Sequence, residues 1–500
     1  PCRTVEFRPP NQFYPRKLTR AMTNDPSNAP VNSPSCRSVR QMISRGVRWA
    51  MTHCPRPVRN HFDLHRSFYA GLLPARIKQY LKTTVRQAGS DVSLRRRLDQ
   101  FLSHEAANNS SGRVFLIFSA VTFTESEGQR PTRLARELAR RGIPVIFAYW
   151  RWKAYRPVQA SGNPGIFCLP IDEFQKDYEN LLGDERLSSL KRVFMMEFPH
   201  PCLFEIVNYA NVCGWRTVYD VIDDWEEFHQ RGQAVWYDSD LETYLLQNAD
   251  VATITQNNLL KKMCDMGAER FVLLPNAFED WPEAGKNSVP PMRTGQITIG
   301  YFGHLTSSWF DWPLIVSVAK RRPDWMFHII GYGLDKRIAS LDNLIFLGPV
   351  EHCDLPAFAK NWDAAMIPFQ ASKLTAAVDP IKIYEYISLG LPAVVTGMPH
   401  LASYPGIFTA SNAAEFEAAV EKAAKTKIDE LTAENFLSAN RWSKRIDALL
   451  KILDEGEHWN ATSLALTKDE LTANQIHPHP SPLRAPTEGW SGEGEFFDRH

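Results

Sequence analysis

Residues 379–395 read DPIKIYEYISLGLPAVV, and the rest of the sequence can be organised around this stretch. Apolar and polar residues follow helical spacing up to Gly390, a typical helix stop, and the β-branched run from residue 393 predicts a buried strand. Asp379 and Pro380 suit a helix start, because Asp can cap the helix and the N–H that Pro lacks is not needed in the first turn. The stretch therefore predicts a helix, a tight turn and a strand of a parallel sheet.

Lys382 and Glu385 lie one helical turn apart near the start of this helix, with Tyr384 and Tyr386 interleaved. A cation beside free N–H groups suits a diphosphate, and a carboxylate accepts hydrogen bonds from sugar or ribose hydroxyls. The same spacing also describes a surface ion pair worth only a few tenths of a kcal/mol. The remainder of the sequence has to decide between a ligand site and a surface pair.

The second half of the sequence repeats this alternation of strands and helices. Gly303, Gly331 and Gly348 follow expected strands, at positions where a backbone has to approach a ligand closely. We expect strands at 297–302, 326–330, 344–347, 364–368 and 393–396, and helices at 314–320, 354–360, 416–424 and within 430–455.

The first half has the same organisation. The apolar run 114–118 is typical of a strand buried on both faces, and a loop with Gly128, a helix at 131–141 and a strand at 145–148 complete a βαβ unit. A single glycine in that loop does not fit the G-x-G-x-x-G pattern of dinucleotide sites. The sequence predicts two α/β domains with doubly wound parallel sheets, with further strands at 193–196, 217–222, 251–253 and 271–274.

Polar side chains follow two strands of the first half, in the sequences EFPH and DVIDDW. Ligands of open α/β sheets bind outside the carboxyl ends of the strands. Neighbouring carboxylates are costly to ionise together, so at least one of the three aspartates is either exposed or tuned for chemistry. Asp220 is expected inside the strand and Asp224 at a helix cap. Asp223 is therefore the first candidate for a catalytic carboxylate, followed by Asp224 and then His200.

Length and composition limit the class of protein. A chain of 500 residues with 44% apolar residues is long enough for about two to four domains with substantial cores. Eight scattered cysteines, without a Cys-x-x-Cys pair or a Cys/His cluster, predict reduced thiols rather than disulfides or a zinc site. No apolar run reaches the roughly 18–20 residues that span a bilayer, and no apolar signal segment is seen at the start. We therefore expect a cytoplasmic protein.

Charge is divided unevenly along the chain. Residues 1–100 carry 19 Lys+Arg against 5 Asp+Glu, whereas residues 101–500 carry 38 against 51. Residues 1–60 have a composition typical of disorder, and residues 65–102 have the pattern of a basic amphipathic helix. Two interpretations of that helix stay open: peripheral attachment to the anionic inner face of a membrane, and packing on the body of the protein. Nucleic acid is disfavoured, because no recognisable module accompanies the charge.

The matching segments of both halves resemble a known family: ITIGYFGHLTSSWFDWPLIVSVAKRRPDWMFHIIG, FLGPV, AAMIPF, DPIKIYEYISLGLPAVV, VYDVIDDW and LLPNAFED. Residues 113–455 are similar to GT-B glycosyltransferases, close to glycosyltransferase family 4 and its teichuronic-acid-type and capsule-type members. The resemblance implies two tandem Rossmann-like domains facing a cleft. The expected organisation is a basic extension at 1–110, an acceptor domain at 111–281, a linker at 282–296, a nucleotide-sugar domain at 297–428, return helices at 429–456 and a disordered tail at 457–500.

The resemblance also assigns roles to residues of the central stretch. Glu385 falls at the glutamate that contacts the donor ribose, and Lys382 resembles the diphosphate-binding lysine of a P-x-K-x-x-E-Y variant, with Asp379 beside it. Ala377 departs from the family, because the first of its two usual glutamates would stand there. The other expected donor-binding residues are Gly303 and His304 near the phosphates, Gly348 and Val350 at the nucleobase, and Gly128. Trp442 and Arg445 resemble the W-x-x-R of a helix that crosses back to the first domain.

The function implied by the resemblance is transfer of a hexose from a UDP- or GDP-sugar to a saccharide or lipid-linked acceptor, in cell-surface polysaccharide or glycoconjugate synthesis. The nucleotide sugar would be a co-substrate, and no cofactor or metal is expected; residues 238–240 fit D-x-D but lie away from the expected donor cleft. Two alternatives stay open. One is a nucleotide-sugar 2-epimerase of the same fold, and the other is a degenerate GT-B binding subunit, which Ala377 would favour.

Overall fold

The structure, a computed structural model, describes residues 92–124, 128–151, 158–282, 294–334, 337–338 and 340–455. Several expectations lie outside these residues: disorder at 1–60 and 457–500, most of the basic helix at 65–102, and most of the linker at 282–296.

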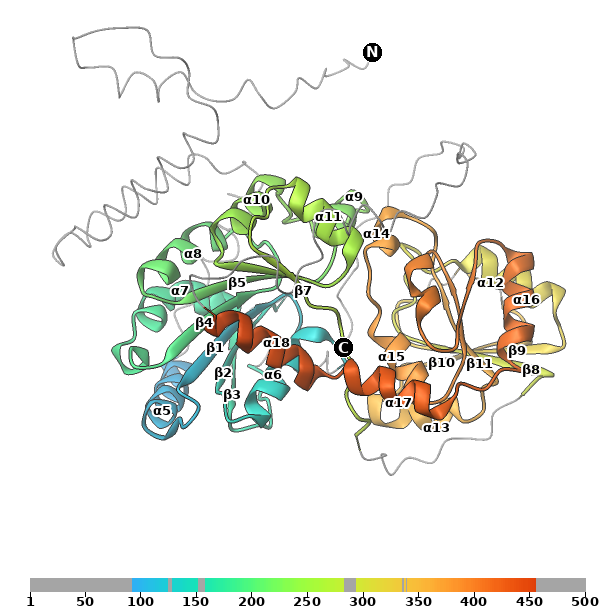
Figure 1. The fold of residues 1–500 in the computed structure, drawn as a ribbon, viewed down its shortest axis with the longest axis horizontal. Helices are drawn as coiled ribbons and strands as arrows, with labels where there is room; N and C mark the ends of the chain where they lie inside the picture. Colours follow the sequence, from blue (N-terminus) through green and yellow to red (C-terminus); the bar gives the residue numbers. More distant parts are fainter. Residues whose placement is uncertain are drawn as a thin grey trace, which may run out of the picture. The chain divides into compact units, whose positions relative to one another are not determined.

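The first half of the described chain forms a seven-stranded parallel sheet in the order β3-β2-β1-β4-β5-β6-β7 (Figure 1). The strands are β1 (Arg113–Ser119), β2 (Val145–Tyr149), β3 (Ile166–Pro170), β4 (Lys191–Met196), β5 (Arg216–Val221), β6 (Val251–Ile254) and β7 (Phe271–Leu273). The helices are α5 (Val92–Asn108), α6 (Arg130–Arg140), α7 (Ile171–Leu182), α8 (Leu203–Val212), α9 (Trp225–Gln230), α10 (Ser239–Asn248) and α11 (Asn257–Asp265).

Successive side chains of β1 point to opposite faces of this sheet, and both faces are covered by helices. Val114, Leu116 and Phe118 belong to a core cluster with α5, α7, α8, α10 and α11, while Phe115 and Ile117 belong to a second cluster with α6. Because both faces are buried, the strand reads as a continuous apolar run, as the sequence predicted. The switch point of the sheet lies between β1 and β4, where Ser119 and Glu197 stand at the carboxyl ends.

The second half forms a six-stranded parallel sheet in the order β10-β9-β8-β11-β12-β13. Its strands are β8 (Ile297–Phe302), β9 (Trp325–Ile330), β10 (Leu344–Gly348), β11 (Ala364–Pro368), β12 (Ala393–Thr396) and β13 (Ile407–Ala410). Its helices are α12 (Trp312–Arg321), α13 (Leu355–Ala359), α14 (Lys373–Ala376), α15 (Ile381–Ser388), α16 (Ala413–Ala423) and α17 (Glu430–Ala439). The predicted class of two doubly wound α/β domains is thus confirmed.

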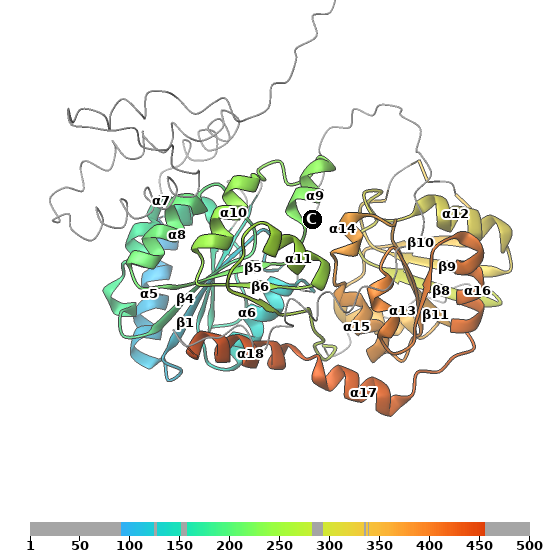
Figure 2. The ribbon, with the colours of Figure 1, turned by 45° about the horizontal axis from the view of Figure 1, so that its top comes forward.

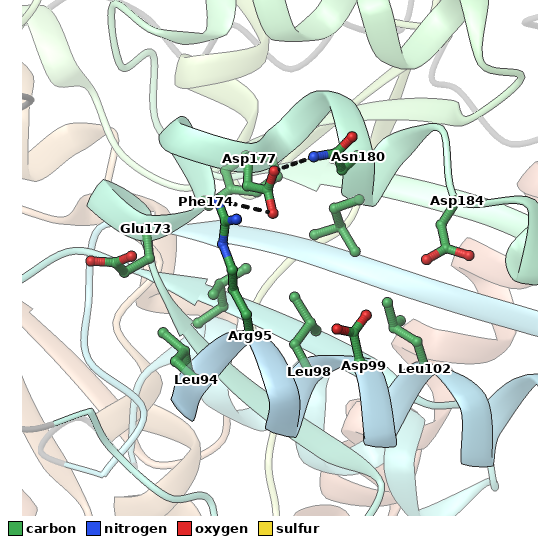
Figure 3. Close-up of a pocket in the computed structure, with 12 residues that line it drawn as sticks. Leu94, Arg95, Leu98, Asp99, Leu102, Glu173, Phe174, Asp177, Asn180 and Asp184 are labelled. Atoms are coloured by element: carbon green, nitrogen blue, oxygen red, sulfur yellow. Dashed lines mark hydrogen bonds and ion pairs between the residues drawn. The ribbon is translucent and has the colours of Figure 1, made fainter. Parts of the chain in front are cut away.

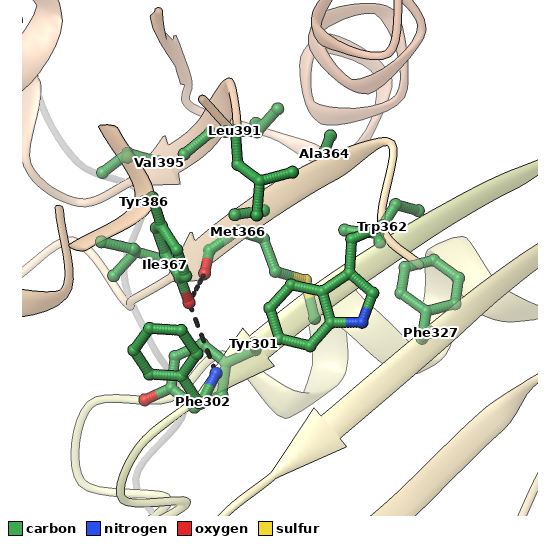
Figure 4. Close-up of a cluster of buried hydrophobic side chains, with 14 of the residues drawn as sticks. Tyr301, Phe302, Phe327, Trp362, Ala364, Met366, Ile367, Tyr386, Leu391 and Val395 are labelled. Atoms are coloured by element: carbon green, nitrogen blue, oxygen red, sulfur yellow. Dashed lines mark hydrogen bonds between the residues drawn. The ribbon is translucent and has the colours of Figure 1, made fainter. Parts of the chain in front are cut away.

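One aromatic residue holds α15 against the centre of the second sheet. The Tyr386 hydroxyl accepts a hydrogen bond from the Phe302 N–H at 3.3 Å and donates to the Met366 carbonyl oxygen at 3.4 Å (Figure 4). These two groups belong to β8 and β11, the strands that flank the switch point. These bonds therefore fix α15 against the two strands at the switch point, beside which an open α/β sheet binds its ligand.

The last helix, α18 (Trp442–Asp454), packs on α6 of the first half (Figure 2). Its apolar face, Trp442, Ile446, Leu449 and Ile452, lies in the same core cluster as Phe115 and Ile117. Arg445 donates to the carbonyl oxygens of Pro275 at 3.0 Å and Asn276 at 3.1 Å. The last helix of the described chain therefore completes the core of the first domain.

The described end of the basic segment, α5, packs on the body of the protein, since Leu94 and Leu102 are buried in the first core cluster. A pocket of about 70 Å³ lies between α5 and α7 (Figure 3). This volume is well below the roughly 300 Å³ of small-molecule sites, so the pocket is no candidate for a nucleotide-sized ligand. Among the helices that the structure describes, none combines the length and apolarity needed to cross a membrane.

Candidate functional site

Three glycines, which have no side chains, lie at the carboxyl edge of the second sheet. Gly303, Gly331 and Gly348 end neighbouring strands, and the Gly331 N–H donates to the Gly348 carbonyl oxygen at 2.9 Å. Gly303 and Gly331 have φ angles of 142° and 147°, which L side chains rarely adopt. A Cβ on Gly331 would lie 1.8 Å from the Gly303 carbonyl oxygen, so only glycine fits there. The three predicted glycines thus meet at one edge, where a ligand can approach the main chain closely.

Lys382 lies in the first turn of α15, beside this edge. A Cβ on Gly303 would be 3.0 Å from Lys382 Cε, and the ammonium lies 5.5 Å from the ring centre of Tyr301 and 5.4 Å from that of Phe369. Among the residues that the structure describes, it has no hydrogen bond or ion pair. Burial lowers the Lys382 pKa to about 8, although the charge of Glu385 opposes the shift. A partly desolvated cation without an ion-pair partner among the described residues is a ready site for an anion.

His304 follows Gly303 and packs beside Lys382. Burial, together with the charge of Lys382, lowers its pKa to about 4, so the imidazole is neutral at neutral pH. Its ring lies 5.4 Å from the Trp309 ring and 4.8 Å from the Tyr332 ring, centre to centre. The structure therefore brings His304, Gly303 and Lys382 together, as the resemblance implies for a phosphate-binding edge.

Glu385, the predicted ribose-binding residue, is buried one turn further along α15. Its Oε1 atom lies 2.7 Å from His352 Nε2 and 4.0 Å from an Arg133 guanidinium nitrogen. Because a carboxylate only accepts hydrogen bonds, the His352 Nε2 carries the proton and donates. The Oε2 atom makes no hydrogen bond to any described residue, so half of this carboxylate is available to a ligand.

Segments from four parts of the sequence meet around Glu385. Arg133 comes from the first turn of α6, and it forms a further ion pair with Glu279 of the connector between the domains. Trp281 of the same connector stacks on His352 at 4.7 Å between ring centres and donates its indole N–H to Ser388 at 2.9 Å. The backbone at Gly128 also approaches, since a Cβ there would lie 3.9 Å from the His352 ring.

The remaining predicted donor-side residues are placed differently. Gly348 ends β10, and Val350 packs half-buried against the core of the second domain, two residues before His352. Asp379 does not cap α15, whose N-cap is Pro380 without a side-chain hydrogen bond, so that expectation was wrong. The physical reason is competition: the Asp379 carboxylate accepts from the Asn276 N–H at 2.6 Å and from the Tyr384 hydroxyl at 3.1 Å. Burial raises its pKa to about 6.

Ala377, where the resemblance implies a glutamate, is buried at 4% exposure in a core cluster of the first domain. A carboxylate at this position would be surrounded by apolar side chains and would carry a desolvation cost. The departure from the family pattern therefore coincides with an apolar contact between the two halves of the protein.

Two of the three aspartates at the carboxyl end of β5 have structural partners. Asp220 is fully buried and accepts two hydrogen bonds from Arg130, at 2.8 and 2.9 Å. Asp224 caps α9 by accepting from the Glu227 N–H at 3.1 Å, and it forms an ion pair with Lys262. The expected positions of Asp220 inside the strand and of Asp224 at a helix cap are both confirmed.

Asp223 differs from these two aspartates. It is partly exposed and makes no hydrogen bond or ion pair with the described residues. Burial of its surroundings and the negative charge of Asp224 raise the Asp223 pKa to about 7. A carboxylate with this pKa and an open hydrogen-bonding capacity suits proton transfer near neutral pH.

His200, the third catalytic candidate, is buried among aromatic rings. Its ring centre lies 4.9 Å from Trp150, 5.7 Å from Phe198 and 6.0 Å from Phe118. Burial lowers its pKa to about 3, and its Nδ1 atom accepts from the Cys202 N–H at 3.3 Å. These contacts favour a packing role for a neutral imidazole.

Sequence reasoning missed Arg130, which holds Asp220, and the residues that join the two halves: Arg133, Asn276, Trp281 and His352. One signal was present in the sequence. Arg130 and Arg133 stand in the first turn of α6, which has no acidic residue, although the helix dipole favours anions there. Cations at the wrong end of a helix indicate that nearby carboxylates hold them, here Asp220 and Glu279.

Comparison with known proteins finds similarity to glycosyltransferases. Residues 297–426 match the family model "Glycosyl transferases group 1". A curated relative from Bacillus subtilis (strain 168), TuaH, whose name provisionally assigns it as a teichuronic acid biosynthesis glycosyltransferase, is 27% identical over 172 residues. That match covers 32% of this chain and 43% of the relative, so the chain spans less than half of the relative's length.

One solved structure shows the fold at low sequence identity, and a second is similar with a lower TM-score. Sucrose-phosphate synthase from Thermosynechococcus elongatus is similar with a TM-score of 0.50 and 10% identity, over 69% of this chain and 98% of that one. The apo lipopolysaccharide outer core galactosyltransferase WaaB has a TM-score of 0.47 and 12% identity, over 68% and 99% of the two chains. The protein therefore has the GT-B fold, and residues 297–426 of its second half are similar to the glycosyl transferases group 1 family.

Proposed function

We propose that the protein is a glycosyltransferase that moves a hexose from a UDP- or GDP-sugar to a saccharide or lipid-linked acceptor in cell-surface polysaccharide or glycoconjugate synthesis. The observation that carries the proposal is the Lys382 ammonium, which is held beside Gly303 without an anionic partner among the described residues. The family match over residues 297–426, which include this site, supports the same reading.

Each part of the donor has a matching group at the carboxyl edge of the second sheet. Lys382 and the backbone around Gly303 would bind the diphosphate and stabilise the charge that develops on it as the sugar leaves. The available Oε2 of Glu385 would accept hydrogen bonds from the ribose hydroxyls. Gly348 and Val350, at the end of β10, would border the nucleobase.

Asp223 is the proposed acceptor-side carboxylate. In the transfer, the acceptor oxygen forms a bond to the anomeric carbon while the bond from that carbon to the diphosphate oxygen breaks. In an inverting reaction Asp223 takes the acceptor proton; in a retaining reaction the proton passes to the leaving diphosphate and Asp223 orients the acceptor. The anomeric configuration of the isolated product distinguishes these two roles.

The proposal is tested by titration calorimetry of the full chain against a panel of UDP- and GDP-sugars, followed by an assay for release of UDP or GDP. Lys382→Ala should lower turnover about 100-fold or more, since a charge-assisted contact in the transition state is lost. Lys320→Ala, which removes an exposed lysine of α12, is the matched control and should behave as the wild type.

The outcomes separate the alternatives. Binding followed by UDP or GDP release that depends on an acceptor supports the transferase. Conversion of the sugar without an acceptor identifies a 2-epimerase. Binding without any turnover identifies a binding subunit, and wild-type turnover in Lys382→Ala contradicts the assigned site. A cytoplasmic location with peripheral attachment to the membrane belongs to the same proposal and fits a lipid-linked acceptor.

A further inference from the structure

The two oxygens of the Glu385 carboxylate have different surroundings. His352 donates to Oε1 at 2.7 Å, and the Arg133 guanidinium approaches the same oxygen at 4.0 Å. Oε2 has no hydrogen-bond partner among the described residues. The carboxylate is therefore fixed in one orientation through one oxygen, while the other stays available.

Arg133 and His352, the two residues near Oε1, are fixed in turn by contacts with other residues. Arg133 is 3% exposed, and its other guanidinium nitrogen pairs with Glu279. The Arg133 guanidinium also lies 3.3 Å from His352 Nε2, which is a packing contact and not a hydrogen bond, because with the proton of Nε2 donated to Glu385 both groups are donors. The His352 ring lies against Trp281 at an interplanar angle of 22°, and Trp281 is tied to Ser388 of α15 by its indole N–H. A glutamate on the second domain is thus restrained by an arginine of the first domain and by the connector.

We propose that Arg133 and His352 are positioning residues, which hold Glu385 in the orientation that binds the donor ribose and so make nucleoside recognition depend on the first domain. This inference rests on the proposed function. Neither residue needs to touch the donor. Their effect is preorganisation, because a glutamate without these contacts would lose its rotamer freedom only when the ligand binds. That loss corresponds to about a tenfold weaker affinity.

The test compares two ligands that share a diphosphate but differ in the ribose. The first is the free nucleoside diphosphate, UDP or GDP, that the wild-type protein binds more tightly, and the second is inorganic pyrophosphate. Pyrophosphate reaches Lys382 but presents no ribose to Glu385. Arg133→Met and His352→Phe should therefore weaken the nucleoside diphosphate about tenfold and change pyrophosphate affinity less than about twofold.

The variants are chosen to keep the packing. His352→Phe preserves the ring stacked on Trp281, and Arg133→Lys keeps the charge, so it should recover part of the affinity that Arg133→Met loses. Arg136→Met is the control on the same helix, since Arg136 lies 5.6 Å over the Phe123 ring and outside this cluster. Its affinities should equal those of the wild type. Thermal melting of each variant shows whether it is folded; if Arg133→Met does not fold, His352→Phe carries the test.

A double-mutant cycle distinguishes positioning from an independent contact. Adding Arg133→Met to Glu385→Gln should cost little further nucleoside diphosphate affinity, because the first change acts only through Glu385. Equal weakening of both ligands, unchanged affinities or full additivity would overturn the inference. A wild-type protein that binds pyrophosphate but neither nucleoside diphosphate would instead contradict the proposed function itself.

Discussion

Replacing Lys382 by methionine should make the protein more stable while removing its diphosphate site. Burial lowers the pKa of this lysine from 10.5 to about 8. At about 1.36 kcal/mol per pKa unit, the charged form costs the folded protein about 3 kcal/mol. Because the side chain is partly exposed, solvent screening reduces this to about 2 kcal/mol. Methionine has a similar length and removes the charge, so Lys382→Met should gain about that amount.

The pH dependence gives this prediction its sign. Below pH 8 the lysine is charged in both the folded and the unfolded protein, and the cost is fully present. Between pH 8 and 10.5 the folded protein releases the proton first, so the wild type gains stability relative to the variant. Above about pH 10.5 both states are neutral, and the electrostatic difference disappears.

Thermal melting at several pH values measures the effect. A gain of about 2 kcal/mol raises the melting temperature of a domain of this size by roughly 4–8 °C. The exposed Lys320→Met is the control and should change stability by less than about 0.5 kcal/mol. UDP or GDP should stabilise the wild type more than Lys382→Met. A gain that is equal at pH 7 and pH 10.5 would come from packing alone and would refute the account of a buried, unpartnered cation.

Three further predictions follow from the proposed site. Glu385→Gln should weaken donor binding by about 1.5–3 kcal/mol in calorimetry, and an unchanged affinity would leave Glu385 as a partner of His352 only. Asp223→Asn should lower turnover about 100-fold while donor affinity stays intact. It should also remove the rise of kcat/KM toward pH 7 that the wild type shows as Asp223 ionises. A loss of donor affinity instead would make Asp223 a structural residue. Binding of the protein to anionic vesicles should be strong at low salt and should weaken as the salt concentration rises. Deleting residues 1–91 should abolish this binding. If the shortened protein still binds vesicles, the membrane contact lies elsewhere in the chain.

Comparison of the expected and observed strands shows which elements a sequence pattern can predict. Central strands such as β1, β8 and β11 are buried on both faces, and their apolar runs were placed to within a residue or two. The strands missed were β3 and β13, each at the edge of its sheet. The other two edge strands, β7 and β10, were predicted, so an edge position alone does not explain the misses. In β13, IFTA, Phe408 and Thr409 are not buried, so the strand lacks a continuous apolar run, whereas β3, IFCLP, is apolar and has no such explanation.

The candidate site was predictable where the chemistry lies within a few residues of sequence. Lys382 and Glu385 share a helix turn, and the glycines follow strands that the pattern identifies. The restraint on Glu385 was not predictable, because Arg133 and His352 come from segments far apart in sequence and meet only in the folded protein. A local pattern indicates what a side chain can bind, but it does not indicate what holds that side chain in place.

The position of α18 affects how the protein folds during synthesis. Trp442, Ile446, Leu449 and Ile452 cover one face of the first sheet, whose last strand already ends at Leu273. About 180 further residues must be translated before this cover emerges, which takes roughly 10–40 s at cellular elongation rates. During that interval the first domain exposes the apolar face that α18 later buries, so we expect this face to be open to aggregation and to chaperone binding until the whole second domain has been made.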